Sequence, residues 1–165
     1  MSIPYLACIV AAAAYYHLPP RVLPSIQAVE GGQVGTIHMN SNGTADLGPM
    51  QVNTVWLEPL AAYAHMTQGA VAARLVNDPC FNIAAAAAIL RLHLNETHNN
   101  LMQAIARYHS RTPALGGTYQ EKVLGAAARL FAHTNAMTSQ SARTGAATLQ
   151  SARTNAGTPH PSRPN

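Results

Sequence analysis

The sequence predicts a mostly α-helical domain with a small β-ribbon, and three observations carry this prediction. Apolar residues make up 48% of the 165-residue chain but aromatic residues only 5%, and alanine is frequent, so helices packed through small side chains are expected. Several segments repeat apolar residues at helical spacing. Between them, the segment from Ile37 to Met50 is too rich in glycine and asparagine for a helix and favours a hairpin that turns at Asn42-Gly43.

The helices are expected on both sides of this ribbon. The pair Pro19-Pro20 ends the first helix, Gly31-Gly32 ends the second, and Asp78 is placed to cap a long alanine-rich helix. The expected helices cover residues 3–16, 21–30, 55–64, 68–75, 80–96, 99–109 and about 117–133.

From residue 134 onward the apolar periodicity is lost. The sequence Ser-Ala-Arg-Thr occurs twice there, at Ser141 and Ser151, among small and polar residues. Such low-complexity composition is typical of disordered segments. The sequence therefore predicts one folded domain over residues 1–133 and a disordered low-complexity tail over residues 134–165.

The chain is sparsely charged and mildly basic. Charged residues account for 10% of it, against roughly 25% in typical globular proteins, and the net charge is +4. The ten cations, of which Lys122 is the sole lysine, are scattered rather than clustered with aromatic residues, so no nucleic-acid partner is expected. A mild positive charge suits an acidic polymer or an envelope surface. The apolar run at the N-terminus is too short to span a bilayer, so no integral membrane segment is expected.

Two cysteines, Cys8 and Cys80, are compatible with three roles: buried small residues, part of a metal site, or a disulfide. No Cys-x-x-Cys motif accompanies them and the eight histidines share no ligand spacing, so no metal is expected. The histidines are instead expected at surface or half-buried positions. A disulfide would close a loop of about 70 residues and would indicate an oxidising compartment.

Glu30 is the acidic residue with the most unusual surroundings among the six in the chain. Asp78 is explained by capping, whereas Glu58, Glu96 and Glu121 lie in polar helical segments and are expected to be solvated. Glu30 falls on the last turn of an apolar helix, where the helix dipole disfavours an anion and makes the acid hold its proton. A surface position at a helix end is the plainer interpretation, and the neighbouring polar loop is what favours a functional one.

The residues that follow Glu30 suit a carbohydrate cleft. A buried carboxylic acid with a raised pKa can protonate the leaving oxygen of a glycosidic bond. Amide side chains can bond sugar hydroxyl and acetamido groups, and glycines let a ligand approach the backbone. The amides concerned are Asn40, Asn42, Gln51 and Asn53, and the glycines are Gly31, Gly43 and Gly48.

The segment from Asn40 to Asn53, together with Glu30, resembles a known motif. It has the pattern Asn-x-Asn-Gly-Thr-x-Asp-x-Gly-x-Met-Gln-x-Asn, which reads NSNGTADLGPMQVN here. This pattern is similar to the active-site signature of the lytic transglycosylases of the soluble-lysozyme-like family, especially the subgroup associated with secretion, conjugation and pilus assembly. Downstream, the segments LVNDPCFNIAAAAAIL, AIARYHS and TYQEKV resemble further family blocks, so the likeness covers about residues 5 to 132.

The resemblance implies a lysozyme-like α+β fold with the β-ribbon at the active-site cleft. It also implies cleavage of peptidoglycan between N-acetylmuramic acid and N-acetylglucosamine, with Glu30 as acid and base, closure of a 1,6-anhydro ring, and no cofactor. Substrate-binding roles would fall to Asn40, Met50, Gln51, Asn53, Tyr108 and His109, and structural roles to Asn42, Gly43, Asp46, Gly48 and Tyr119. An early cysteine usually pairs with one at the position of Cys80 in this family, which implies the disulfide Cys8–Cys80.

Three positions depart from the family pattern: Gly31 replaces a serine, Pro49 an aliphatic residue and His109 an asparagine. If these replacements abolish catalysis, the protein would be a catalytically silent, peptidoglycan-binding assembly factor, which is one alternative to a transglycosylase. A hydrolysing muramidase is another, because Asp46 could serve as a second carboxylate. A structural role for Asp46 at the Asn-Gly turn is favoured. The expected setting is the periplasm or cell envelope. The expected partners are peptidoglycan strands and components of an envelope-spanning secretion, conjugation or pilus machine.

Overall fold

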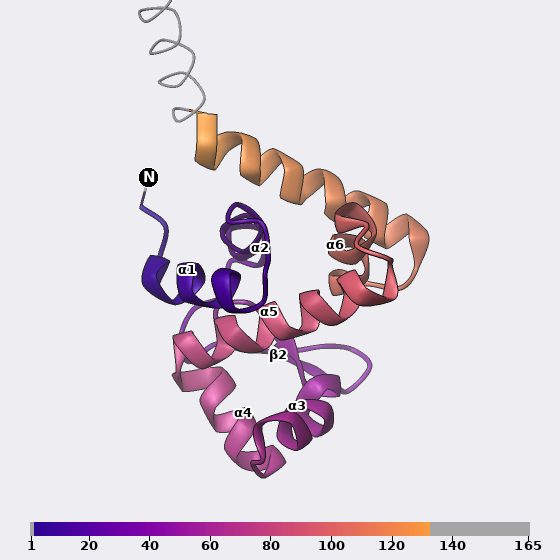
Figure 1. Ribbon diagram of the computed structural model, residues 1–165. Coiled ribbons are helices and arrows are strands. Elements are labelled where there is room, and N and C mark those ends of the chain that lie inside the picture. Colours follow the sequence, from indigo (N-terminus) through magenta and orange to yellow (C-terminus); the bar gives the residue numbers. More distant parts are fainter. Residues whose placement is uncertain (1, 133–165) are drawn as a thin grey trace, which may run out of the picture. The chain divides into compact units, whose positions relative to one another are not determined.

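The computed structural model describes residues 2–132, and a compact unit ending at Leu130 contains most of them (Figure 1). The described helices are α1 Leu6–Tyr15, α2 Val22–Glu30, the 3-10 helix η1 Thr54–Trp56, α3 Leu57–Ala64, α4 Gln68–Asn77, α5 Pro79–Glu96, α6 Leu101–His109, and a last helix of residues 113–132. Its strands are β1 Ile37–Met39, β2 Ala45–Leu47 and β3 Val52–Asn53. The predicted mostly α fold with a small β-ribbon is confirmed, whereas the predicted tail of residues 134–165 lies outside the described residues.

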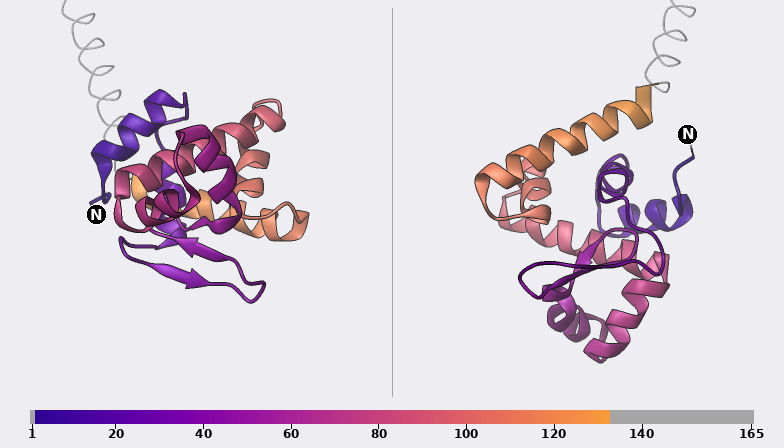
Figure 2. Two further views of the ribbon diagram at one scale, coloured as in Figure 1. Left: turned by 90° about the horizontal axis from the view of Figure 1, so that it is seen from below. Right: turned by 180° about the vertical axis from the view of Figure 1, so that it is seen from behind.

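The alanine-rich helix α5 forms the centre of the core and contacts α1, α4 and α6 (Figures 1 and 2). Its residues Ile83, Ala86, Ala87 and Leu90 are completely buried. Small residues let the neighbouring helices approach closely, and the branched side chains fill the spaces between them. This arrangement explains how a chain with only 5% aromatic residues builds a packed core.

The β-ribbon contains the expected hairpin and one strand that the sequence pattern did not indicate. Strands β1 and β2 pair antiparallel with His38 opposite Asp46, and β2 pairs with β3 so that Asp46 also lies opposite Asn53. Gly43 adopts φ 82° in the turn, a conformation that glycine enters without steric cost. Figure 2 shows the hairpin extending to one side of the helices. Strand β3 has only two residues, too few to produce a recognisable alternation.

The last helix begins at residue 113, earlier than the expected start near Gly117. Proline is well tolerated in the first turn of a helix, so Pro113 suits this start. Gly116 and Gly117 therefore lie inside the helix. A Cβ on Gly116 would come 2.9 Å from the Cβ of Ala106, so glycine allows this helix to pack closely on α6.

The start of α5 is held by a cap and a covalent bond. The carboxylate of Asp78 accepts a hydrogen bond from the backbone N–H of Phe81 at 3.0 Å, which confirms the predicted N-cap. The first turn of α5 also carries Cys80, which forms the expected disulfide with Cys8 of α1, with the two Cα atoms 5.0 Å apart. The bond therefore joins the first helix to the central one.

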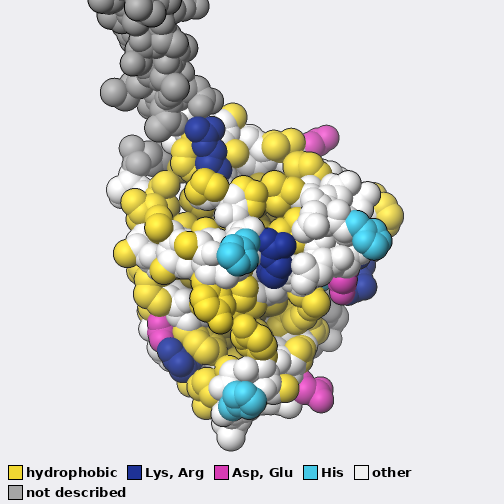
Figure 3. Space-filling view, in the orientation of Figure 1, with side chains coloured by type: hydrophobic (Ala, Val, Ile, Leu, Met, Phe, Trp, Pro, Cys, Tyr) yellow, Lys and Arg dark blue, Asp and Glu magenta, His cyan; other side chains and the backbone are white. Residues whose placement is uncertain are grey.

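The described surface carries few charges. Figure 3 shows hydrophobic atoms over much of one face with isolated charged side chains between them. Among the described helices, none is long and apolar enough to cross a membrane alone; α4 and α5, bent by 112°, reach the required length and composition only as a pair.

Candidate active site

Glu30 is the last residue of α2, as the sequence predicts. Gly31 ends the helix in the left-handed region, with φ 65°, and its N–H donates to the carbonyl of Gln27 at 3.0 Å. A Cβ on Gly31 would meet no atom within 4 Å, so the backbone conformation, not a lack of space, favours glycine here. Glycine meets this conformation without the steric cost that a serine at the same position would carry.

The environment of Glu30 favours its protonated form and raises its pKa from an ordinary 4.5 to about 7. Desolvation by burial is the largest cause, and the negative charge of Asp46 adds to it. The hydroxyl of Tyr119, which donates to Glu30 Oε1, and the cation Lys122 lower the pKa without offsetting the burial. Loss of solvent is thus the main cause of proton retention. Near neutral pH, comparable fractions of Glu30 are protonated and ionised.

The polar side chains of the ribbon converge on Asp46. Asn40 donates to Asp46 Oδ2 at 3.0 Å, and Asn53 donates to Oδ1 at 2.7 Å. The hydroxyl of Thr44 accepts from the same two amides at 3.1 and 3.0 Å and donates to Asn42 Oδ1 at 2.8 Å. Both oxygens of the Asp46 carboxylate are therefore held by amides, and the network links β1, β2 and β3.

Met50 and Gln51 lie where the ribbon returns to the helices. The side chain of Met50 is 0% exposed and packs in the core, which differs from the sugar-contacting position expected for it. Its backbone carbonyl accepts a hydrogen bond from the hydroxyl of Tyr108 at 3.1 Å, which ties this segment to a side chain of the groove wall. Gln51 has φ 48°, uncommon for a residue other than glycine, and its amide donates to the Gly48 carbonyl at 2.8 Å. Backbone of this kind persists where the surrounding structure holds it, often at functional sites.

Asn82 holds this loop in place, a role that the sequence analysis did not assign. It is completely buried on α5, donates to the carbonyls of Leu47 and Leu75 at 2.8 and 2.9 Å, and accepts from the Met50 N–H at 2.8 Å. The loop approaches α4 and α5 so closely that a Cβ on Gly48 would lie 2.1 Å from the Leu75 carbonyl oxygen. A polar residue on the apolar face of a core helix, in the segment NDPCFN, was the signal available in the sequence.

A groove of about 650 Å³ runs past Glu30, Asp46 and Gln51. The predicted site residues that line it are Glu30, Asn40, Asn42, Asp46, Gln51, Asn53, Tyr108 and His109. Those that lie outside its lining are Gly43, Gly48, Met50 and Tyr119. Tyr119 is buried beside Glu30, and its ring stacks on His109 with the ring centroids 4.6 Å apart. Tyr119 thereby connects the acid to the groove wall.

The groove also reaches a charged cluster that the sequence analysis did not identify. His93, whose side chain is 2% exposed, packs edge-on against Trp56 and places Nδ1 3.1 Å from Glu96. Arg107 and Arg111 bind the same carboxylate at 3.2 and 3.3 Å. His93 is thus buried, which differs from the surface or half-buried position expected for it. Glu96 is exposed, as expected, and it also forms ion pairs with two arginines. Sequence spacing could not show the contacts of Glu96 with Arg107 and Arg111, because they form only when the end of α5 packs beside α6.

The arrangement supports acid–base chemistry on a polymer that lies along the groove. Among residues 2–132, no group of three His, Cys, Asp or Glu side chains is placed to hold a metal ion. A partly buried acid beside amides and a tyrosine can give and take protons while the amides bind sugar hydroxyl groups.

These features define a lysozyme-like α+β protein with a single proton-retaining glutamate in its groove. The transglycosylase SLT domain family matches residues 7–121, and the chain belongs to this family. Its members are lytic transglycosylases that act on peptidoglycan in the cell envelope. The predicted family is confirmed, while the secretion-associated subgroup stays a prediction. A comparison with curated protein sequences gave no match.

Proposed function

We propose that the protein cleaves the bond between N-acetylmuramic acid and N-acetylglucosamine and closes a 1,6-anhydro ring on the muramic acid. The observation that carries the proposal is the state of the two carboxylates in the groove. Glu30 is partly buried with a pKa raised to about 7, whereas both oxygens of Asp46 are occupied by amides. An acid that is part protonated and part ionised near neutral pH suits a reaction in which one group gives and then takes a proton.

In the first step, protonated Glu30 gives its proton to the glycosidic oxygen as the bond from C1 of muramic acid to that oxygen breaks. The oxygen leaves as the 4-hydroxyl of N-acetylglucosamine, and the acetamido oxygen of the substrate attacks the electron-deficient C1. In the second step, ionised Glu30 takes the proton from the C6 hydroxyl, whose oxygen attacks C1 and displaces the acetamido group. No water is consumed, because the C6 hydroxyl takes its place. No protein nucleophile is needed, because the acetamido group of the substrate supplies it, as in other substrate-assisted reactions of glycosides.

The neighbours of Glu30 have distinct proposed roles. Tyr119 binds Oε1 and leaves Oε2 for proton transfer. Tyr108 fixes the Met50 carbonyl and hence the backbone that carries Gln51, and it is also the proposed contact for the substrate acetamido group. The proposed sugar contacts are the groove-lining side chains Asn40, Gln51, Asn53 and His109.

A hydrolysing muramidase is the second candidate. Asp46 lines the same groove as Glu30, and its charge contributes to the raised pKa of Glu30. If Asp46 acted as base or nucleophile, water would replace the C6 hydroxyl as the final acceptor of the sugar, and the product would carry a reducing end.

Mass spectrometry of digested murein sacculi tests both candidates. We expect anhydro-muropeptides from the unmodified protein, none from Glu30→Gln, and residual anhydro product from a folded Asp46→Asn variant. Reducing muropeptides, or complete loss of activity in folded Asp46→Asn, would assign the hydrolase instead. A folded, unmodified protein that binds sacculi but releases nothing would be a silent binding factor.

We further propose that the enzyme opens the wall locally for a secretion, conjugation or pilus apparatus. Support comes from the motif NSNGTADLGPMQVN, and the disulfide between Cys8 and Cys80 suits an oxidising envelope compartment. Replacing the native gene by one encoding Glu30→Gln should lower the output of that apparatus while the protein remains present, and an unchanged output in all such assays would contradict this role.

A further inference from the structure

Side chains of opposite charge line the groove. Glu30 and Asp46 are the acids among them, and Arg107 and Arg111 are the cations. The charges that shift the pKa of Glu30 are those of Asp46 and Lys122, and they do not include the two arginines. The arginines are therefore not among the groups that shift the pKa of the proposed catalytic acid, and a separate role in the groove wall is open to them.

Arg107 and Arg111 share one carboxylate, that of Glu96, at 3.2 and 3.3 Å. A hydrogen bond from His93 is the largest cause that lowers the pKa of Glu96, so this group stays ionised at neutral pH. Burial lowers the pKa of His93, which is consequently uncharged at neutral pH. Two cations facing one anion give this arginine cluster (Arg107, Arg111 and Glu96) one positive charge in excess.

The arginine cluster can accept a further anion. The side chains of Arg107 and Arg111 are 38% and 70% exposed. In the described part of the chain, each bonds Glu96 through one terminal nitrogen only, whereas a guanidinium carries five N–H donors. The planar guanidinium matches a carboxylate better than other groups do, since two parallel N–H bonds can form.

The carboxylates of peptidoglycan are found on one kind of substituent. N-acetylated sugar rings are neutral, so the strand's negative charge lies on the lactyl group of muramic acid or on the peptide stem attached to it. We propose that Arg107 and Arg111 bind a carboxylate of this lactyl–peptide substituent while the glycan occupies the part of the groove at Glu30. The inference rests on the proposed function and adds a specificity determinant to it.

The contact between the arginines and the carboxylate is tested by altering each partner in turn: the carboxylate chemically and the arginines by mutation. Glycan strands with intact stems, and strands stripped to free lactyl groups by an amidase, are each assayed before and after their carboxyl groups are coupled to methylamine. For the unmodified protein we expect blocking to lower kcat/KM roughly ten-fold, mainly through KM, on the strand type whose carboxylate is bound. The responding strand type distinguishes a stem carboxylate from a lactyl one.

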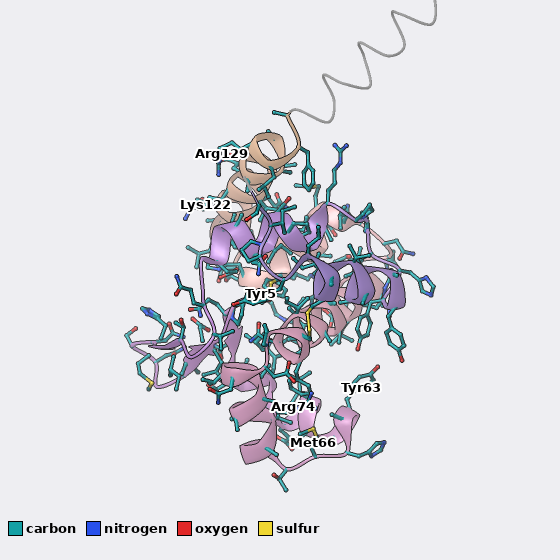
Figure 4. The ribbon with its side chains drawn as sticks, turned by 90° about the vertical axis from the view of Figure 1, so that its left-hand side faces the viewer. Tyr5, Tyr63, Met66, Arg74, Lys122 and Arg129 are labelled. Atoms are coloured by element: carbon teal, nitrogen blue, oxygen red, sulfur yellow. A yellow bond between two sulfur atoms is a disulfide. The ribbon has the colours of Figure 1, made fainter. Side chains whose placement is uncertain are left out.

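The double variant Arg107→Gln/Arg111→Gln should show the same low kcat/KM on blocked and unblocked strands, because the partner of the carboxylate is gone. Arg129→Gln is the matched control, since Arg129 projects from the helix of residues 113–132 outside the groove lining (Figure 4), and it should keep the full response to blocking. If the double variant does not fold, Arg111→Gln, which removes the more exposed cation, should reduce the response. A folded variant that responds to blocking as strongly as the unmodified protein overturns the inference.

The outcomes also separate this inference from the proposed function. An unmodified protein that cleaves all strands with no response to blocking refutes the arginine contact and leaves the proposed function intact. If the unmodified protein cleaves no strand, the proposed function fails. The arginine contact is then tested by binding: the dissociation constant for labelled strands with blocked carboxyl groups should exceed that for unblocked strands. Equal dissociation constants for the two kinds of strand would overturn the arginine contact.

Discussion

Replacing Glu30 by glutamine should stabilise the fold at neutral pH while it removes activity. The native pKa of Glu30 is raised to about 7, whereas its ordinary value is 4.5. Between these values the unfolded chain releases the proton and the native protein keeps it, so the free energy of unfolding falls as pH rises through this window. Below pH 4.5 both states are protonated and the penalty is absent.

The size of the effect follows from the width of the window. The interval from 4.5 to about 7 corresponds to at most about 3 kcal/mol, at 1.36 kcal/mol per pH unit. Glutamine is neutral and removes this pH-dependent part. Its other effects, including a changed hydrogen bond with Tyr119, are present at every pH. They therefore cancel when the variant is compared with the unmodified protein at two pH values.

Urea unfolding at pH 4 and pH 8, with the disulfide intact, measures this difference. The stability of Glu30→Gln relative to the unmodified protein should rise by about 2 to 3 kcal/mol between the two pH values. Glu58→Gln, which removes an exposed acid in α3, controls for the loss of one negative charge. A relative stability of Glu30→Gln that is the same at both pH values would refute the claim that burial governs this acid.

Three further predictions concern the neighbours of the site. Tyr119→Phe removes a donor that lowers the pKa of Glu30, so the alkaline limb of the kcat/KM profile should move up by about one pH unit; an unmoved limb would contradict this. Asn82→Ala removes three hydrogen bonds to backbone groups and should cost about 3 kcal/mol in urea unfolding; a cost below about 1 kcal/mol would contradict the proposed role of Asn82 in holding the loop. Cys8→Ser should cost roughly 4 kcal/mol for a bond spanning 72 residues, and thiol labelling of both cysteines in the unreduced native protein would show that the bond is absent.

Local sequence signals were sufficient for most of the fold. The prediction of α2 succeeded because apolar residues at helical spacing meet a glycine that supplies the left-handed cap, and this placed Glu30 on the last turn. The cap of α5 was predictable because Asp78 bonds an amide only three residues away. The hairpin was predictable because the Asn42-Gly43 pair suits a tight turn.

Features that depend on contacts distant in the sequence were missed. Asn82 bonds residues up to 35 positions away, so its spacing says nothing about its partners. The cluster at Glu96 combines α5 with residues 11 and 15 positions further along the chain. The last helix was expected to begin near Gly117 but begins at residue 113. The close approach of Gly116 to α6, which favours a glycine inside this helix, depends on how the helices pack and is not visible in the sequence.

The sequence by itself determined the family, the helical character of the chain and Glu30 as the candidate acid, because these follow from local pattern and from a contiguous motif. Only the tertiary structure decided how that acid behaves. Burial, Tyr119 from the last helix, and Asp46 from the ribbon together set its pKa, and none of these influences is adjacent to Glu30 in the chain. Electrostatic interactions and desolvation depend on distance in space, which the fold alone determines.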